Sequence, residues 1–209
     1  MSRSEPARHG ARHRARLAQP RTKPATVRRD ELMNAAEALF LAQGVDATPV
    51  SDIVERADVA KGTFYHYFPS KTALLQALGE RYAARFVAGV DEAVARCAAD
   101  DWPGRLRTWV EATLAQYLDS YPLHDVVYVN HHHHRVSAEK TAIVTSLRTV
   151  LEAGQAAGAW QLQHPAALAL MLFGGIHGAA DHLIATNSRE PGFIAEIVTG
   201  CLHAVGAGH

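Results

Sequence analysis

Apolar positions recur at a helical period along most of this chain, and this pattern predicts an all-α fold. The first helix is expected to run from Val27 to Gln43, and Gly44 follows it as a stop signal. A second, short helix is expected with Thr48 as its N-cap and Pro49 as its first residue. The chain therefore begins with a compact group of helices.

A third short helix is expected to begin near Ala60, after a turn at residues 57–59. Phe64 and Phe68 share the face of this helix that points back at the second helix. The opposite face is small, polar and basic, and a helix that only packed against others would not need it. Its members are Lys61, Gly62, Thr63, Tyr65 and His66. This arrangement is typical of a helix-turn-helix that binds in a major groove of DNA.

The run KGTFYHYFPSK at residues 61–71, preceded by a helix that ends in Ala-Gln-Gly, resembles the DNA-binding domain of the tetracycline-repressor (TetR) family of bacterial regulators. The resemblance covers residues 28–80. Two positions depart from the family pattern, since Asp58 stands where the turn usually has Gly and Ala60 where the third helix usually has a Ser N-cap. Asp tolerates a left-handed turn, and a lost cap costs about 1 kcal/mol, so the fold is expected to survive both changes.

The resemblance also implies which residues contact DNA. The phosphate-binding set is Thr48, Ser51, Tyr65 and Lys71. The set that faces base edges is Lys61, Gly62, Thr63 and His66, and Tyr67 completes the predicted site. Lysines and hydroxyls at helix starts suit phosphate, and a glycine lets the backbone approach the groove. The alternative is a solvated helix face whose aromatic pair only packs.

The carboxy-terminal part is predicted to form longer helices. Ser70 caps one that continues to about Cys97 and connects the two parts of the chain. The next helix begins after residues 100–104 and is expected to stop at Tyr121 and Pro122. A short helix is expected at 124–134. Another is expected to open at Ser137 and to end at Gly154 and Gly158.

The last two predicted helices, at 165–186 and 192–205, are apolar on nearly every side. Helices of this kind are buried on more than one side. The resemblance implies that they pair with their symmetry mates in a four-helix homodimer interface. Gly174, Gly175 and Gly178 would allow a close approach there, and close packing of Gly174 and Gly175 within the subunit remains the alternative.

The resemblance further implies a pocket for a small-molecule effector among the carboxy-terminal helices. The predicted lining consists of aromatic or polar residues on otherwise apolar helix faces, namely Trp109, Thr113, Tyr117, Tyr121, Tyr128, Phe173 and His177. Taken one at a time, each of these residues is more typical of an ordinary core position than of a ligand contact.

A run of four histidines, His131 to His134, raises the question of a metal site. Consecutive residues of a helix point in different directions, so at most His131 and His134 would serve one ion. His177 and Asp181 lie four residues apart on a later helix. We expect no metal at these residues and interpret them as polar residues of a loop and of a pocket wall.

The formal net charge of zero hides an asymmetry between the two ends of the chain. Residues 1–29 hold nine Arg and Lys against Glu5, a balance of +8, so residues 30–209 carry −8. A disordered basic arm on an acidic body is typical of a tail that binds phosphate. Entry of this arm into a minor groove and a merely non-specific attraction to DNA both remain open.

The remaining composition favours an ordinary globular protein, since 48% of the 209 residues are hydrophobic. Cys97 and Cys201 lie in predicted helices without a CxxC motif, which indicates reduced thiols and a cytoplasmic protein. Uninterrupted apolar runs of 18 residues do not occur, so no membrane span is expected.

The sequence thus predicts a disordered basic arm over residues 1–25, a helix-turn-helix domain over 26–72, and a helical effector-binding and dimerisation domain over 73–209. The predicted function is a homodimeric repressor that a small-molecule effector releases from a palindromic DNA operator. No cofactor and no enzymatic activity are expected. The alternatives are a histidine-rich metal sensor or metal-dependent enzyme, and a helical module that binds other proteins.

Overall fold

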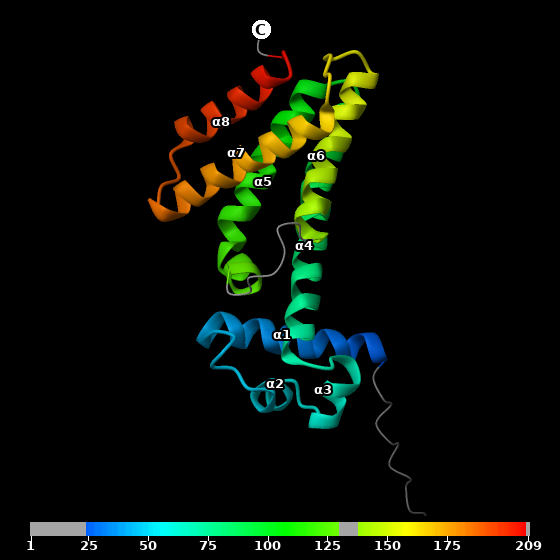
Figure 1. Ribbon diagram of the computed structural model, residues 1–209, viewed down its shortest axis with the longest axis vertical. Coiled ribbons are helices and arrows are strands. Elements are labelled where there is room, and N and C mark those ends of the chain that lie inside the picture. Colours follow the sequence, from blue (N-terminus) through cyan, green and yellow to red (C-terminus); the bar gives the residue numbers. More distant parts are fainter. Residues whose placement is uncertain (1–23, 130–137, 208–209) are drawn as a thin grey trace, which may run out of the picture.

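The computed structural model describes residues 24–129 and 138–207, and all regular elements in these ranges are helices (Figure 1). They are α1 (Ala25–Gln43), α2 (Val50–Arg56), α3 (Lys61–Tyr67), α4 (Lys71–Ala95), α5 (Trp102–His124), the π-helix η1 (Asp125–Val129), α6 (Ala138–Ala156), α7 (Pro165–Ala185) and α8 (Pro191–Ala204). The predicted all-α fold is confirmed. Residues 1–23 of the predicted arm and the run from His131 to His134 lie outside the described residues.

The amino-terminal domain consists of α1, α2, α3 and the first two turns of α4. Figure 1 shows α1 crossing the lower end of α4, with α2 and α3 below it. Its core joins all four helices and includes Leu32, Phe40, Ile53, Phe64, Phe68, Leu74 and Leu78. Because Leu74 and Leu78 belong to this core, we extend the domain to residue 78, six residues past the predicted boundary.

The turns of this domain follow the predicted chemistry. Gly44 ends α1 with φ 85°, a left-handed conformation that glycine adopts without strain. Asp58 occupies the turn between α2 and α3 with φ 51°, so the departure from glycine is tolerated there. Ala60 precedes α3 without a side-chain cap, as expected.

The predicted N-cap of α2 is wrong. Pro49 occupies the N-cap position, and α2 begins at Val50. Thr48 is fully buried, and its hydroxyl donates to the Gly44 carbonyl oxygen at 2.7 Å. The hydroxyl therefore satisfies a carbonyl beside the end of α1 and does not cap the amides of α2.

Helix α4 connects the amino-terminal domain to the carboxy-terminal one (Figure 1). Ser70 caps it as predicted, because its hydroxyl oxygen accepts a hydrogen bond from the Ala73 amide at 3.1 Å. With 25 residues the helix is about 37 Å long. Helices α5 and α6 pack along its upper part, and α7 and α8 pack against α5. The second core includes Phe86, Val90, Leu106, Trp109, Leu114, Leu147, Leu151, Ile176, Val198 and Leu202.

Helix α5 does not stop at Tyr121 and Pro122. It continues through Pro122 to His124 and passes directly into η1. The short helix predicted at 124–134 is therefore continuous with α5 as far as residue 129, and its residues 130–134 lie outside the described ones. A proline inside a helix leaves the carbonyl four residues earlier without its usual donor. Here that carbonyl belongs to Leu118, and the Arg189 guanidinium donates to it at 3.3 Å.

Helix α6 runs past Gly154 to Ala156, and Gly158 follows with φ 79°. The prediction that Gly154 ends the helix was wrong because this glycine has a packing role. A Cβ at residue 154 would lie 2.1 Å from Cζ2 of Trp160. The Trp160 ring is buried and donates from Nε1 to the Leu151 carbonyl oxygen at 2.8 Å.

Helix α7 combines a buried face with an exposed apolar one. Within the described part of the chain, it is the one helix with the length and composition of a membrane span, with a mean hydropathy of 1.4. The core helix of a soluble protein meets the same criterion. Buried residues of α7 such as Leu172 and Ile176 pack in the second core, whereas Leu170 and Met171 are more than half exposed.

We predict that Gly154→Ala lowers the free energy of unfolding by about 1–3 kcal/mol, because the added methyl group would displace the Trp160 ring. Urea unfolding followed by circular dichroism measures the change. Arg148→Ala, at an exposed position of the same helix, is the control and should change stability by less than about 0.5 kcal/mol. Equal stabilities of the two variants would contradict the close packing.

Candidate nucleic-acid interface

Helix α3 presents two opposite faces. Phe64 and Phe68 are buried, with ring centroids 5.9 Å apart, and they hold the helix against α1, α2 and α4. On the other side, Tyr65 is 51% exposed, and Lys61 and His66 are exposed as well. The structure therefore leaves the predicted polar and basic face open to solvent.

Two members of this face have no packing role in the described chain. A Cβ at Gly62 would meet no atom within 4 Å, so this glycine is not required for close packing inside the molecule. Lys61 is exposed and makes no hydrogen bond or ion pair with the described residues. Both positions are accessible to an external partner.

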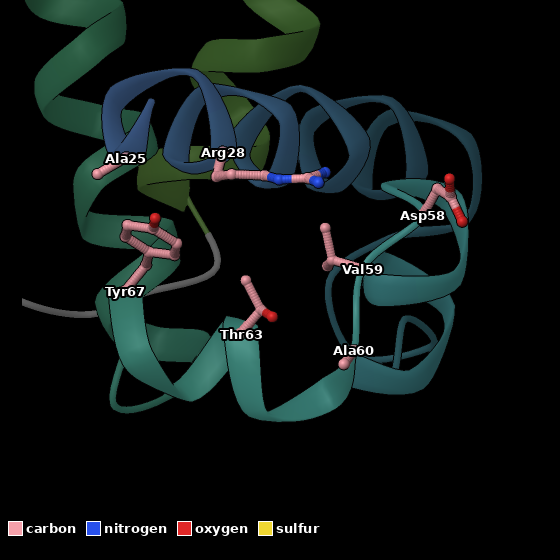
Figure 2. A pocket seen from close by; sticks show the side chains of 7 residues that line it. All are labelled: Ala25, Arg28, Asp58, Val59, Ala60, Thr63 and Tyr67. Atoms are coloured by element: carbon pink, nitrogen blue, oxygen red, sulfur yellow. The ribbon is translucent and has the colours of Figure 1, made fainter. Parts of the chain in front are cut away.

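Thr63 and Tyr67 are half-buried and line a cleft of about 530 Å³ between α1 and α3. Figure 2 shows the side chains around it, with Arg28 contributed by α1. The complete lining is Ala25, Arg28, Asp58, Val59, Ala60, Thr63 and Tyr67. Sequence reasoning missed Arg28, because one more arginine at the end of a basic segment carries no distinguishing signal.

Lys71 has a structural role that the sequence did not predict. Its ammonium donates to the carbonyl oxygens of Val45 at 2.7 Å and of Thr48 at 3.1 Å. It therefore fastens the loop between α1 and α2 to the start of α4. These two bonds use two of the three ammonium donors to position α2, and the phosphate contact of Lys71 stays a prediction.

The two predicted hydroxyls near the start of α2 also differ from each other. Ser51 is exposed and donates to the Asp52 carboxylate at 3.0 Å, so it remains on the candidate surface. Thr48 is buried and leaves that surface, because its hydroxyl is used within the loop. The corrected candidate interface consists of Ser51, Lys61, Gly62, Thr63, Tyr65, His66 and Tyr67, with Arg28 added.

The residues predicted to line an effector pocket fall into different environments. Trp109 is fully buried and donates from Nε1 to the Ser146 hydroxyl at 3.0 Å. Tyr128 donates from its hydroxyl to the Gly79 carbonyl oxygen at 3.1 Å. Tyr121 lies in the last turn of α5 and is 37% exposed, so its place in a pocket wall stays a prediction.

A polar cluster joins α5 to α7 within the carboxy-terminal domain. The Tyr117 hydroxyl donates to Oδ1 of Asp181 at 2.9 Å, and Nδ1 of His177 lies 3.2 Å from Oδ2 of the same carboxylate. The His124 ring lies 4.8 Å from that of Tyr117, and Phe173 lies 5.7 Å from His177. Three of the predicted lining residues are thus close neighbours.

The protonation states of this cluster follow from its burial. Burial lowers the pKa of the His124 imidazole below its ordinary value, although the hydrogen bond with Asp125 acts in the opposite direction. Burial, reinforced by the bond to Asp181, raises the pKa of the Tyr117 hydroxyl. At neutral pH the His124 imidazole is therefore neutral and the Tyr117 hydroxyl is protonated.

Thr113 lies one helical turn from both Trp109 and Tyr117 on α5. It is 95% buried, since 5% of its surface is exposed, and its hydroxyl has no hydrogen-bond partner. A buried hydroxyl without a partner costs free energy. Among the predicted lining residues, Thr113 is thus the one with a buried hydroxyl that has no partner in the described chain.

The described residues contain no group of three or more His, Cys, Asp or Glu side chains arranged to hold a metal ion. His177 and Asp181 contact each other directly, as their spacing of four residues allows. The histidines at 131–134 are outside the described residues, so the prediction of no metal there remains untested.

These observations define a helix-turn-helix protein whose third helix is exposed and whose second domain is entirely helical where it is described. Residues 32–78 match the sequence family described as "Bacterial regulatory proteins, tetR family". The amino-terminal domain thus matches this family, which confirms the resemblance that the motif at residues 61–71 indicated.

Three similar proteins extend the comparison. The transcriptional repressor NemR of Escherichia coli (strain K12) is 27% identical over 126 residues, which span 60% of each chain. A protein of unknown function from Rhodococcus sp. RHA1 has a similar structure, with a TM-score of 0.73, 24% identity, and coverage of 91% of this chain and 98% of that one.

The third is the transcriptional regulator FadR from Bacillus subtilis, solved in complex with stearoyl-CoA. It has a TM-score of 0.64 and 19% identity, and the match covers 86% of this chain and 99% of that one. The two structural likenesses establish the fold alone. Because the matched part of NemR is 60% of its length, the activity of the whole chain is a matter for proposal.

The two lysines at the ends of the 61–71 motif should respond differently to the same substitution. Lys71→Met should lower the free energy of unfolding by about 1–3 kcal/mol, because two loop carbonyls lose their charged donor. Lys61→Met should change it by less than about 0.5 kcal/mol, since that side chain is exposed. Thermal and urea unfolding measure both, and equal losses would contradict the assignment of Lys71 to the loop.

Proposed function

We propose that this protein is a DNA-binding transcriptional repressor that inserts α3 into the major groove. The observation that carries the proposal is the exposed basic and polar face of α3, mounted on the buried pair Phe64 and Phe68. Such a helix is rigidly held and accessible at the same time. The match of residues 32–78 to a family of bacterial regulatory proteins and the similarity to the repressor NemR support the same function.

Within this interface, Lys61 and His66 are proposed to face base edges, and Ser51 and Tyr65 to contact phosphates. A lysine can donate to the acceptors of guanine, and hydroxyl groups suit phosphate oxygens. Gly62 is proposed to let the backbone approach the groove, which its free surroundings support. Lys71 and Thr48 are proposed to act indirectly, by fixing the loop that carries α2.

The protein is further proposed to be a homodimer through α7 and α8. The exposed face of α7 carries Leu170, Met171 and glycines 174, 175 and 178, and a Cβ at these glycines would meet nothing within 4 Å. Packing within the described subunit therefore does not explain Gly174 and Gly175, which supports close approach by a second copy. A two-fold dimer would place its two α3 helices in half-sites about 34–36 Å apart.

Release from DNA is proposed to follow binding of a small molecule in the carboxy-terminal domain. The free hydroxyl of Thr113 and the cluster around Tyr117 and His177 are the polar groups available to it. FadR, which has the same fold, was solved with stearoyl-CoA bound, which supports a small-molecule site in this architecture. An effector that prefers the released conformation would shift the population by a coupling of about 1–3 kcal/mol.

The protein should bind strongly to a duplex that carries the DNA upstream of its own gene. Its affinity should fall steeply between about 50 and 200 mM salt, and the slope of log affinity against log salt gives the number of phosphates neutralised. Fluorescence anisotropy measures both. Lys61→Met should reduce affinity by about 5- to 150-fold, corresponding to about 1–3 kcal/mol, and relax the preference at one base pair. Arg85→Ala, an exposed charge on α4, is the control. Salt-independent binding, or equal effects of the two variants, would argue against this interface.

Gly174→Glu should convert the dimer to a monomer, because a charged side chain would be buried where two copies approach. The fold should persist, since the new side chain meets no atom of its own subunit. Light scattering after size-exclusion chromatography measures the mass. Ala88→Glu on the exposed side of α4 is the matched control and should leave the dimer intact. A dimeric Gly174→Glu variant would place the interface elsewhere.

A further inference from the structure

The cleft between α1 and α3 combines a charged group with hydroxyl groups from a second helix. Figure 2 shows the Arg28 side chain extending along its α1 side, with Thr63 on the opposite side and Tyr67 at one end. Ala25, Val59 and Ala60 contribute apolar surface between them. A site with a cation, two hydroxyls and small apolar side chains suits a sugar-phosphate group, whose charge and deoxyribose need both kinds of contact.

One hydrogen bond orients the Arg28 side chain, and the other N–H donors of its guanidinium are left without a partner in the described chain. Its Nη1 donates to Oε2 of Glu31 at 3.1 Å, and its side chain is 30% exposed. A guanidinium has five N–H donors in a rigid fork, so this contact orients the group and leaves donors for an anion. Arg28 precedes residues 32–78, which match the family, and was absent from the predicted site.

The neighbouring Arg29 provides a contrast. Its guanidinium carbon lies over the Phe68 ring, 5.3 Å from the centroid, and its Nη1 lies 3.4 Å from the Met33 sulfur. Arg29 is absent from the lining of the cleft. The two adjacent arginines therefore point in different directions, and of the two Arg28 alone lines the cleft.

We infer that this cleft binds one backbone phosphate of the DNA duplex in each half-site, with Arg28 as its principal ligand and the Thr63 hydroxyl on the facing helix as a second donor. The inference rests on the proposed function, because it requires α3 to lie in the major groove next to the cleft. The carboxylate of Asp58, which also lines the cleft, repels an anion. This side chain lies at the edge of the cleft (Figure 2) and is exposed, so water and salt screen the repulsion. The contact anchors α1 to the strand whose bases α3 faces.

The test compares Arg28→Ala with Arg29→Ala in the full-length protein, using the duplex upstream of its own gene. Arg28→Ala should lower affinity about tenfold and reduce the salt slope by about 0.9 per subunit, as loss of one phosphate contact requires. Ethylation interference identifies each phosphate whose modification weakens binding. With Arg28→Ala, one such phosphate should disappear from the pattern in each half-site. Arg29→Ala should retain the complete wild-type pattern.

The outcomes separate this inference from the function on which it rests. If wild-type protein binds the duplex with a steep salt dependence but both variants keep the same ethylation pattern, the cleft is not a phosphate site and the function stands. If both variants lose affinity equally with an unchanged pattern, only diffuse charge is involved and the inference is overturned. Absence of salt-dependent binding by the wild type would overturn both. Melting temperatures of the variants show that each remains folded.

Discussion

The structure depends on how a seven-residue helix is held in a defined orientation. Helix α3 is too short to be stable alone, because an isolated helix of this length cannot offset the cost of its nucleation. Burial of Phe64 and Phe68 stabilises it, each by about 1.5–3 kcal/mol. The same burial fixes the orientation of α3 about its axis. Packing of the aromatic pair in the core therefore also decides which polar side chains of α3 face solvent.

Other parts of the amino-terminal domain fix what surrounds α3. The Lys71 ammonium holds the loop before α2, and the Arg81 guanidinium bridges α4 to Asn34 and Glu37 of α1 at 2.8 and 2.6 Å. From the other domain, Val127 of η1 is buried in this same core. The orientation of the amino-terminal domain therefore depends on contacts with α4 and η1. A shift of either element would change the position of α3.

Much of this arrangement was predictable from local chemistry. The periods of α1, α4, α7 and α8, the Ser70 cap, the Gly44 stop and the left-handed turn at Asp58 all follow from short stretches of sequence. Two of the errors arose where a side chain from beyond the end of the helix overrides the local signal. Pro122 stays inside α5 because Arg189 satisfies the freed carbonyl, and Gly154 stays inside α6 because Trp160 packs on it.

The candidate site divides in the same way. The sequence alone determined that α3 has one aromatic and one polar face, since that depends only on spacing along a helix. Only the tertiary structure decided that Lys61 is free whereas Lys71 is bound to the Val45 carbonyl, 26 residues away, and that Arg28 lines a cleft with Thr63. The physical reason is that exposure and hydrogen-bond partners depend on segments brought together by folding, whereas the face of a helix depends on the helix itself.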